Sequence, residues 1–398
     1  MKALLLENIH SDAAAILADR GFEVETRSGA LGEEELIEAL DGVSLLGLRS
    51  RTHVTERVLN ERPGLRCVGA FCIGTNQIDL AAADERGVAV FNAPYSNTRS
   101  VVELAIGEII ALARHLTDQN ALMQSGVWRK SATGSHEIRG RVLGIVGYGN
   151  IGSQLSVLAE SLGMRVIFYD IVDRLALGNA RRCETLAELL AEAEVVSLHI
   201  DGRKENEGFF GEEEFAQMRE RSLFINLCRG FVVDLEALQR ALASKHLAGA
   251  AIDVFPEEPA ANGDPFVSSL QGLDNVILTP HVGGSTQEAQ KDIGHFVALK
   301  MADFADYGTT TLSVNFPEVH GSRAGVMRIL DVHRNVPGAL GRLNAVVGSH
   351  EVNIAAQQLA TRGGLGYVVT DIDSTEHPHL IEELKALPET ISVETIEW

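Results

Sequence analysis

The chain has 398 residues, of which 45% are hydrophobic and 22% charged. These proportions exclude a disordered or collagen-like protein and predict two or three folded domains. Asp and Glu number 55 against 34 Lys and Arg, for a formal net charge of −21. We therefore expect neither nucleic-acid nor membrane binding. No signal peptide or membrane span is predicted, and the four cysteines lack metal-ligand spacing, so we expect a cytoplasmic protein with no metal site.

The first part of the chain alternates short apolar runs with amphipathic segments. Strands are predicted at residues 2–8, 22–27, 43–49, 65–71 and 88–94, and helices at 11–21, 33–42, 56–64 and 78–87. Such alternation is typical of βαβ units and a parallel sheet. A long helix over 99–115 is expected to carry the chain into a second domain, and a helix over 286–306 to carry it back.

A second alternating series lies between these two helices. Its predicted strands are 142–149, 165–170, 194–200, 222–228, 248–255 and 275–280. Six strands with intervening helices predict a doubly wound nucleotide-binding domain.

The last part of the chain has a different order of elements. Strands are predicted at 326–335, 352–362, 365–373 and 390–396, with helices at 337–350, opened by Pro337, and 377–387. This βαββαβ order is that of a ferredoxin-like domain. The expected fold class is therefore α/β, with two doubly wound Rossmann-like domains followed by a ferredoxin-like domain.

A glycine motif marks the nucleotide site. Gly147, Gly149 and Gly152 form a G-x-G-x-x-G between a predicted strand and a predicted helix, where glycines permit a tight turn and close approach of a pyrophosphate. Asp170 ends the next strand and could accept hydrogen bonds from both adenine-ribose hydroxyls, which favours NAD over NADP. The alternative is a glycine-rich turn followed by a surface Asp.

Three polar residues follow the ends of later strands, where ligands of open α/β sheets bind. Arg229 could bind a carboxylate bidentately and polarise an adjacent carbonyl. His281 beside Glu258 would make a proton carrier suited to hydride transfer at a carbon bearing a hydroxyl and a carboxylate. The alternative is that the three are unconnected loop residues.

These motifs resemble the D-isomer-specific 2-hydroxyacid dehydrogenases. Over most of its length, the sequence resembles the bacterial members of this family that begin L-serine synthesis and carry a C-terminal ACT domain. The resemblance is carried by residues 147–152, Asp170, 229–230, 253–259 and 279–284, and more widely by 47–52, 71–76, 91–100 and 314–319. It implies a substrate-binding domain over 1–96 and 284–325, an NAD-binding domain over 97–283 and an ACT domain over 326–398.

The resemblance also implies the reaction, which is oxidation of 3-phospho-D-glycerate to 3-phosphohydroxypyruvate with NAD. Arg229 would hold the substrate carboxylate and polarise the keto oxygen, His281 would be the acid/base, and Glu258 its partner. A side reaction reducing 2-oxoglutarate is a further hypothesis. Another NAD-dependent D-2-hydroxyacid dehydrogenase, or a non-enzymatic NADH-sensing corepressor, remain alternatives.

The cofactor residues follow from the same resemblance. Asn150 and Ile151 would lie against the pyrophosphate, and Asp253 on the nicotinamide side. The full expected set is Gly147, Gly149, Asn150, Ile151, Gly152, Asp170, Leu227, Cys228, Arg229, Asp253, His281, Val282, Gly283 and Gly284. Leu227 and Cys228 stand where the family usually has two small residues, and backbone contacts to the cofactor can survive that change.

The substrate phosphate is expected at Arg49, Ser50 and Arg51, with Asn97 nearby. Arg49 and Arg51 are two apart near the end of a predicted strand, so in extended geometry they point the same way. In so acidic a chain they could supply the local positive field that a phosphorylated acid needs. The alternative is a solvated pair of surface arginines.

Regulation and assembly are implied by the resemblance as well. His333, Asn335 and Asn353 would bind L-serine as an effector, since Asn side chains both donate and accept hydrogen bonds. Asn335 could instead cap the helix that follows it. Relatives imply a homotetramer, and Trp128 is either a contact to a neighbouring subunit or a core residue.

Overall fold

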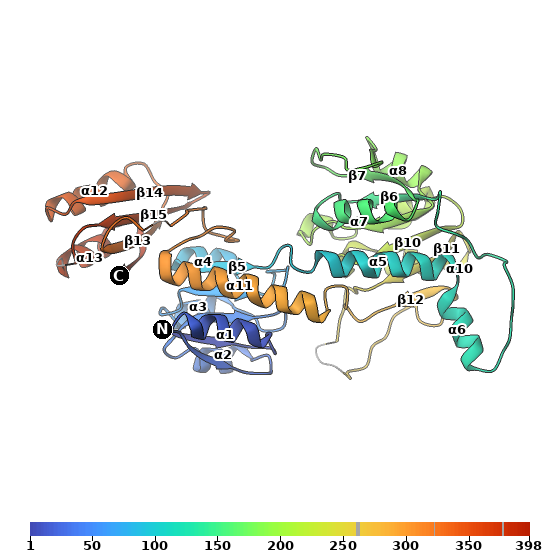
Figure 1. Cartoon of the computed structure of the whole chain (residues 1–398), viewed down its shortest axis with the longest axis horizontal. Coiled ribbons are helices and arrows are strands. Elements are labelled where there is room, and N and C mark those ends of the chain that lie inside the picture. The colour runs from blue at the N-terminus through green and yellow to red at the C-terminus, as the bar shows by residue number, and fades with distance from the viewer. Residues whose placement is uncertain (260–262, 322, 376–377) are drawn as a thin grey trace. The chain divides into compact units, whose positions relative to one another are not determined.

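The computed structural model describes residues 1–259, 263–321, 323–375 and 378–398. It divides into two compact units: residues 1–96 with 290–398 form unit 1, and residues 97–289 form unit 2 (Figure 1). Within the described ranges, no helix is both long and apolar enough to cross a membrane.

The first half of unit 1 is a five-stranded parallel sheet in the order β2-β1-β3-β4-β5. Its strands are β1 (Lys2–Leu5), β2 (Glu23–Thr26), β3 (Val43–Leu48), β4 (Cys67–Ala70) and β5 (Ala89–Asn92). Its helices are α1 (Ser11–Asp19), α2 (Glu33–Ala39), α3 (Glu56–Glu61) and α4 (Leu80–Arg86). The predicted strands and helices of this region are confirmed.

The return helix α11 (Gln287–Tyr307) joins this core from far along the sequence. Val297 and Met301 are fully buried on it and belong to the same apolar cluster as residues of β1, β4 and β5. Gly69 on β4 allows the close approach, because a Cβ there would collide with the Met301 and Val297 side chains. A non-local contact thus requires glycine at this strand position.

The C-terminal part of unit 1 is a ferredoxin-like domain with an antiparallel sheet in the order β14-β15-β13-β16. Its elements are β13 (Met327–Arg334), α12 (Ala339–Ser349), β14 (Ile354–Arg362), β15 (Leu365–Ile372), α13 (Pro378–Lys385) and β16 (Thr390–Glu397). The predicted start of the first helix at Pro337 is wrong. Gly338 adopts a left-handed φ of 85°, which no helical residue has, so α12 begins at Ala339.

Unit 2 is a doubly wound domain with a seven-stranded parallel sheet in the order β12-β11-β10-β9-β6-β7-β8. Its strands are β6 (Val142–Val146), β7 (Arg165–Tyr169), β8 (Arg181–Arg182), β9 (Val195–Leu198), β10 (Ser222–Asn226), β11 (Leu247–Ile252) and β12 (Val276–Leu278). The six predicted strands are confirmed, and β8 is an unpredicted edge strand of two residues.

Helices cover both faces of this sheet (Figure 1). They are α5 (Thr98–Ala113), α7 (Asn150–Ser161), α8 (Leu186–Glu192), α9 (Glu212–Gln217) and α10 (Leu235–Ala243), with short 3₁₀ turns η1 (Lys204–Asn206) and η2 (Gly230–Val232). The helix α6 (Leu116–Gln124) has no buried residue and does not cover the sheet. The long predicted helix ends at Ala113, and His115, with a left-handed φ of 50°, separates it from α6. The α/β fold class expected from the sequence is confirmed.

Candidate active site

The glycine turn between β6 and α7 has the geometry that the motif predicts. Gly147 has a left-handed φ of 91°, and a Cβ there would lie 2.6 Å from the carbonyl oxygen of His199. A Cβ at Gly152 would collide with the Gly147 carbonyl oxygen. At Gly149, by contrast, nothing lies within 4 Å of the Cβ position. The turn is therefore closed on its protein side and open at the helix N-terminus, where a phosphate would bind.

Asp170 follows β7 and lies beside this turn. Its carboxylate accepts hydrogen bonds from the backbone N–H groups of Tyr148 and Val172, both at 2.8 Å. The side chain is only 9% exposed, and the Arg174 guanidinium lies 3.7 Å away. These contacts hold the carboxylate in one orientation next to the glycine motif.

Asp253 organises the loop after β12. It is buried, and its carboxylate accepts hydrogen bonds from the Thr279 hydroxyl at 2.6 Å and from the N–H groups of Val282 and Gly283, both at 2.8 Å. Its own carbonyl accepts the His281 N–H at 2.8 Å. One buried carboxylate thereby fixes the backbone on both sides of the candidate acid/base.

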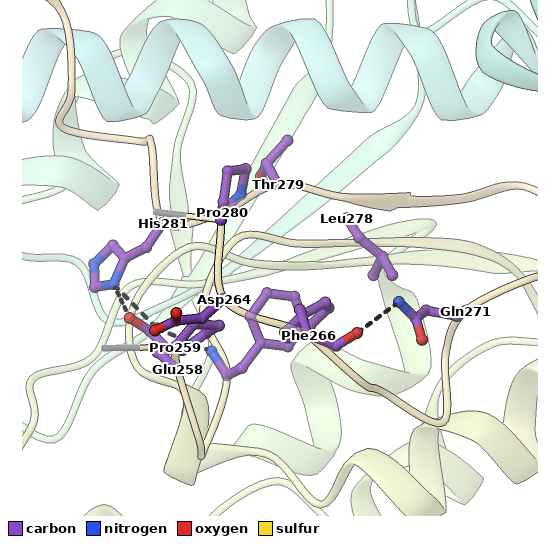
Figure 2. Close-up of a pocket in the computed structure, with 11 residues that line it drawn as sticks. Glu258, Pro259, Asp264, Phe266, Gln271, Leu278, Thr279, Pro280 and His281 are labelled. Atoms are coloured by element: carbon purple, nitrogen blue, oxygen red, sulfur yellow. Dashed lines mark hydrogen bonds and ion pairs between the residues drawn. The ribbon is translucent and has the colours of Figure 1, made fainter. Parts of the chain in front are cut away.

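His281 and Glu258 form the pair that the sequence predicts (Figure 2). The His281 Nδ1 atom lies 3.0 and 2.9 Å from the two Glu258 carboxylate oxygens. The hydrogen bond to Glu258 raises the pKa of His281, although partial burial opposes this. Burial alone would raise the pKa of Glu258, but the hydrogen bonds from His281 and the Phe255 N–H lower it below its usual value. The pair is therefore a carboxylate beside an imidazole that readily holds a proton.

The backbone of His281 is itself unusual. Its φ of 52° is left-handed, which is uncommon for a residue other than glycine and recurs at functional sites. His281 and Glu258 line a cavity of about 400 Å³ together with Phe255, Phe266 and Leu278. His281 and Glu258 lie at one end of it in Figure 2.

Arg229 lies in the turn after β10. Asn226 shapes that turn by donating to the Arg229 carbonyl at 3.1 Å and accepting the Cys228 N–H at 3.1 Å. Gly230 is required there, because a Cβ would collide with the Phe255 backbone. Asn226 is not among the site residues predicted from the sequence. The signal that could have indicated its role is its place as a polar residue at the end of a buried strand.

Leu227 and Cys228, the departures from the family pattern, are both buried with 7% exposure. Leu227 packs in the apolar cluster that contains α5 and α7 residues, and Cys228 in the opposite cluster. Burial raises the pKa of the Cys228 thiol to about 11. The core therefore accommodates these larger side chains, and we expect the buried thiol to react slowly at neutral pH.

The expected substrate-phosphate residues fall in both units. Arg49, Ser50 and Arg51 form the loop after β3 in unit 1, and Arg51 is 47% exposed. Asn97 opens unit 2, where its Oδ1 atom is buried without a hydrogen-bond partner among the described residues. A Cβ at Gly284 would collide with the Asn97 side chain, so these two residues lie in contact.

The expected effector residues do not come together within one chain. His333 pairs with Gly366, whereas the strand that follows Asn353 pairs with Ile372 at the other end of β15. Six residues of β structure separate these ends by about 20 Å. Asn335 donates to the Gly363 carbonyl and Asn353 to Asp373, and His333 is buried with Nδ1 2.9 Å from Asp331.

Sequence reasoning missed two buried carboxylates. Glu7 receives three backbone N–H groups from residues 50–52. Glu108, on α5, is 4% exposed, and neither of its carboxylate oxygens has a hydrogen-bond partner among the described residues. Burial, together with the negative charge of Asp253, raises the pKa of Glu108 to about 8. An acidic residue on the apolar face of a helix was the signal for Glu108.

Comparison with known proteins agrees with this geometry. Residues 106–283 match the model of the D-isomer specific 2-hydroxyacid dehydrogenase NAD binding domain, and residues 329–392 match that of the AHAS small subunit-like ACT domain. D-2-hydroxyisocaproate dehydrogenase (TM-score 0.71) and the D-lactate dehydrogenase of Aquifex aeolicus complexed with NAD and lactic acid (TM-score 0.69) are each 25% identical and cover 79% of this chain and all of theirs. These matches define an NAD-binding 2-hydroxyacid dehydrogenase.

More similar relatives narrow the assignment. The D-3-phosphoglycerate dehydrogenase of Escherichia coli strain K12 is 52% identical over 394 residues, covering 98% of this chain and 96% of its own. D-3-phosphoglycerate dehydrogenase 2 of Saccharomyces cerevisiae is 44% identical over 403 residues, covering 98% and 86%. The chain therefore belongs to the D-3-phosphoglycerate dehydrogenase family.

Unit 2 fits NAD by its own geometry as well. The open approach at Gly149, the N-terminus of α7 and the oriented Asp170 carboxylate are the features that bind a dinucleotide pyrophosphate and an adenine ribose. The expectation of NAD as cofactor is confirmed.

Proposed function

We propose that this chain oxidises 3-phospho-D-glycerate to 3-phosphohydroxypyruvate with NAD, the first step of L-serine synthesis. The observation that supports it best is the hydrogen-bonded His281–Glu258 pair beside the Asp253-organised loop, in a chain of this family. A cofactor-sensing protein would not need an acid/base pair with a raised imidazole pKa, so the corepressor alternative is disfavoured.

His281, Glu258 and Arg229 would carry out the chemistry. In oxidation, neutral His281 accepts the C2 hydroxyl proton through Nε2, because Nδ1 is bonded to Glu258. Glu258 stabilises the imidazolium that forms. Arg229 holds the substrate carboxylate and stabilises the developing carbonyl oxygen. NAD supplies the acceptor for the C2 hydride.

The remaining residues of the cofactor site would bind and orient NAD without taking part in the chemistry. Gly147, Gly149 and Gly152, with Asn150 and Ile151 in the first turn of α7, would bind the pyrophosphate. Asp170 would accept the ribose hydroxyls. Leu227, Cys228, Asp253, Val282, Gly283 and Gly284 would line the nicotinamide end, the first two through their backbone.

Arg49, Ser50, Arg51 and Asn97 would recognise the rest of the substrate. Two arginines suit a phosphate dianion, and they also suit a second carboxylate, so we include slow reduction of 2-oxoglutarate as a side reaction. In domain terms, 1–96 and 284–325 would bind substrate, 97–283 NAD, and 326–398 the effector. We place the enzyme in the cytoplasm, where free thiols such as its four cysteines are the rule.

We propose L-serine as a feedback effector that binds between two copies of the C-terminal domain. Strand β14 is at the edge of the sheet. Pairing it antiparallel with β14 of a second copy would bring Asn353 of one chain beside Gly363 of the other, where Asn335 and His333 lie. This pairing would assemble the three effector residues that one chain keeps apart.

A homotetramer would need a second contact, in unit 2. No residue of α6 is buried, and it leads into a segment in which Val127 and Trp128 are 47% and 79% exposed. Large apolar side chains that are exposed side by side, as Val127 and Trp128 are, favour burial of this segment against another subunit. Trp128 is not a core residue of its own chain.

NADH oxidation with 3-phosphohydroxypyruvate, with and without L-serine, tests these proposals together. Turnover that serine suppresses is the expected result. If serine leaves the turnover unchanged, only the proposal that serine is an effector is rejected. If there is no turnover with 3-phosphohydroxypyruvate, the proposed substrate is wrong. The His281→Ala variant should lose turnover far more than NADH affinity, and equal losses would contradict its acid/base role.

A further inference from the structure

Glu7 lies in an unusual position at the end of β1. Its side chain is only 2% exposed, and its carboxylate accepts the backbone N–H groups of Ser50 at 3.2 Å, Arg51 at 3.1 Å and Thr52 at 2.8 Å. Glu7 and Asn8 both have left-handed φ angles, 62° and 53°. The backbone thus adopts a costly conformation at the point where it turns this carboxylate toward the 49–52 loop.

Three successive N–H groups that face one anion form a concave anion-binding site. In many proteins such a site binds a phosphate directly. Here a buried carboxylate of the same chain occupies it, and leaving that carboxylate without these donors would be strongly unfavourable. Glu7 and the loop therefore hold each other in one conformation.

The other side of the loop is held too. The Arg49 carbonyl accepts hydrogen bonds from Gln77 Nε2 at 2.5 Å and Cys72 Sγ at 3.5 Å. The Arg51 guanidinium is 3.9 Å from Glu7 through Nε and remains 47% exposed. The loop backbone is thus held from both sides, by Glu7 at the N–H groups of residues 50–52 and by Gln77 and Cys72 at the Arg49 carbonyl.

From this geometry we propose that Glu7 is a positioning residue for recognition of the substrate phosphate. It fixes residues 49–52 so that Arg49 and Arg51 present their side chains together. Because Glu7 takes the backbone donors, the phosphate is bound by the two guanidinium groups and the Ser50 hydroxyl, not by the Ser50 N–H. The inference rests on the proposed role of Arg49 and Arg51 in binding that phosphate.

The test compares a phosphorylated with an unphosphorylated substrate. Glu7→Gln keeps the shape but removes the charge and points an amide N–H₂ at backbone donors. We expect it to raise KM for 3-phosphohydroxypyruvate at least tenfold, about 1.4 kcal/mol. The kcat, the Kd for NADH and the kcat/KM for hydroxypyruvate should stay within twofold. Glu7→Asp, which keeps the charge, should recover part of the lost affinity.

Asp84→Asn is the matched control. Asp84 is a partly buried acid of the same sheet domain that accepts a hydrogen bond from Asn315 at 2.8 Å, away from the 49–52 loop. The Asp84→Asn substitution should leave the preference for the phosphorylated substrate unchanged, even if it lowers Tm as much as Glu7→Gln does.

The outcomes separate this inference from the proposed phosphate site. If Arg51→Ala raises KM for the phosphorylated substrate but Glu7→Gln and Glu7→Asp do not, Glu7 has no positioning role and the phosphate site stands. If Arg51→Ala and Arg49→Ala leave that KM unchanged, the phosphate site is wrong and the inference falls with it. If Glu7→Gln lowers kcat/KM equally for 3-phosphohydroxypyruvate and hydroxypyruvate, the role of Glu7 is purely structural. If Glu7→Gln does not fold, the same comparison with Glu7→Asp decides.

Discussion

Replacing Glu108 with Gln should stabilise unit 2, and by more at pH 8 than at pH 5. Burial and the charge of Asp253 raise the pKa of Glu108 to about 8, against 4.5 for an exposed Glu. Between these values the native state holds a proton that the unfolded chain has released. The native state binds more protons, so the free energy of unfolding falls as pH rises through this window.

The magnitude follows from the width of the window. At about 1.4 kcal/mol per pH unit, the step from pH 5 to pH 8 costs the unsubstituted chain about 4 kcal/mol. Gln cannot ionise, and its cost of burying an amide is the same at both pH values. At about 2–4 °C per kcal/mol for a domain of this size, the Tm advantage of Glu108→Gln should grow by roughly 10 °C between pH 5 and pH 8.

Scanning calorimetry at the two pH values measures this, and the transition of unit 2 is identified as the one that added NAD raises. Glu103→Gln is the matched control, because Glu103 lies on the same helix but is 60% exposed and paired with Arg99. Its Tm effect should differ little between the two pH values. If the advantage of Glu108→Gln is the same at pH 5 and pH 8, Glu108 is not a protonated acid in the native state and the reasoning is refuted.

Three further predictions concern the active site. Glu258→Gln replaces the charged acceptor whose hydrogen bond and negative charge raise the pKa of His281 with a neutral amide, so the acid limb of the pH profile for oxidation should move to lower pH, and an unmoved limb would show that Glu258 does not set this pKa. Gly152→Ala places a Cβ against the Gly147 carbonyl oxygen, so a fluorescence titration should show at least tenfold weaker NADH binding; unchanged affinity would contradict the close turn. Iodoacetamide at neutral pH should alkylate the partly exposed Cys72 before Cys228, whose pKa burial raises to about 11, and peptide mapping that finds Cys228 modified first would overturn the expectation that it reacts slowly.

Much of this protein could be predicted from sequence because the signals are local. Alternating apolar runs and helix-ending glycines indicate βαβ units, and a glycine motif between a strand and a helix indicates a dinucleotide site whatever surrounds it. Arg229, Glu258 and His281 each follow a predicted strand, and the carboxyl ends of parallel strands share one edge of the sheet, so the sequence predicts that they lie near one another. The hydrogen-bonded Glu258–His281 pair agrees with that reasoning.

What the sequence alone determined, then, were the α/β elements, the nucleotide motif and the residue types of the candidate site. Only the tertiary structure revealed that Glu7 holds residues 50–52, that the buried Glu108 carboxyl has no hydrogen-bond partner among the described residues, and that Asn353 lies far from His333 in one chain. The physical reason is that burial and strand register depend on segments distant in sequence. A glutamate looks the same in a sequence whether water or a neighbouring loop surrounds its carboxylate.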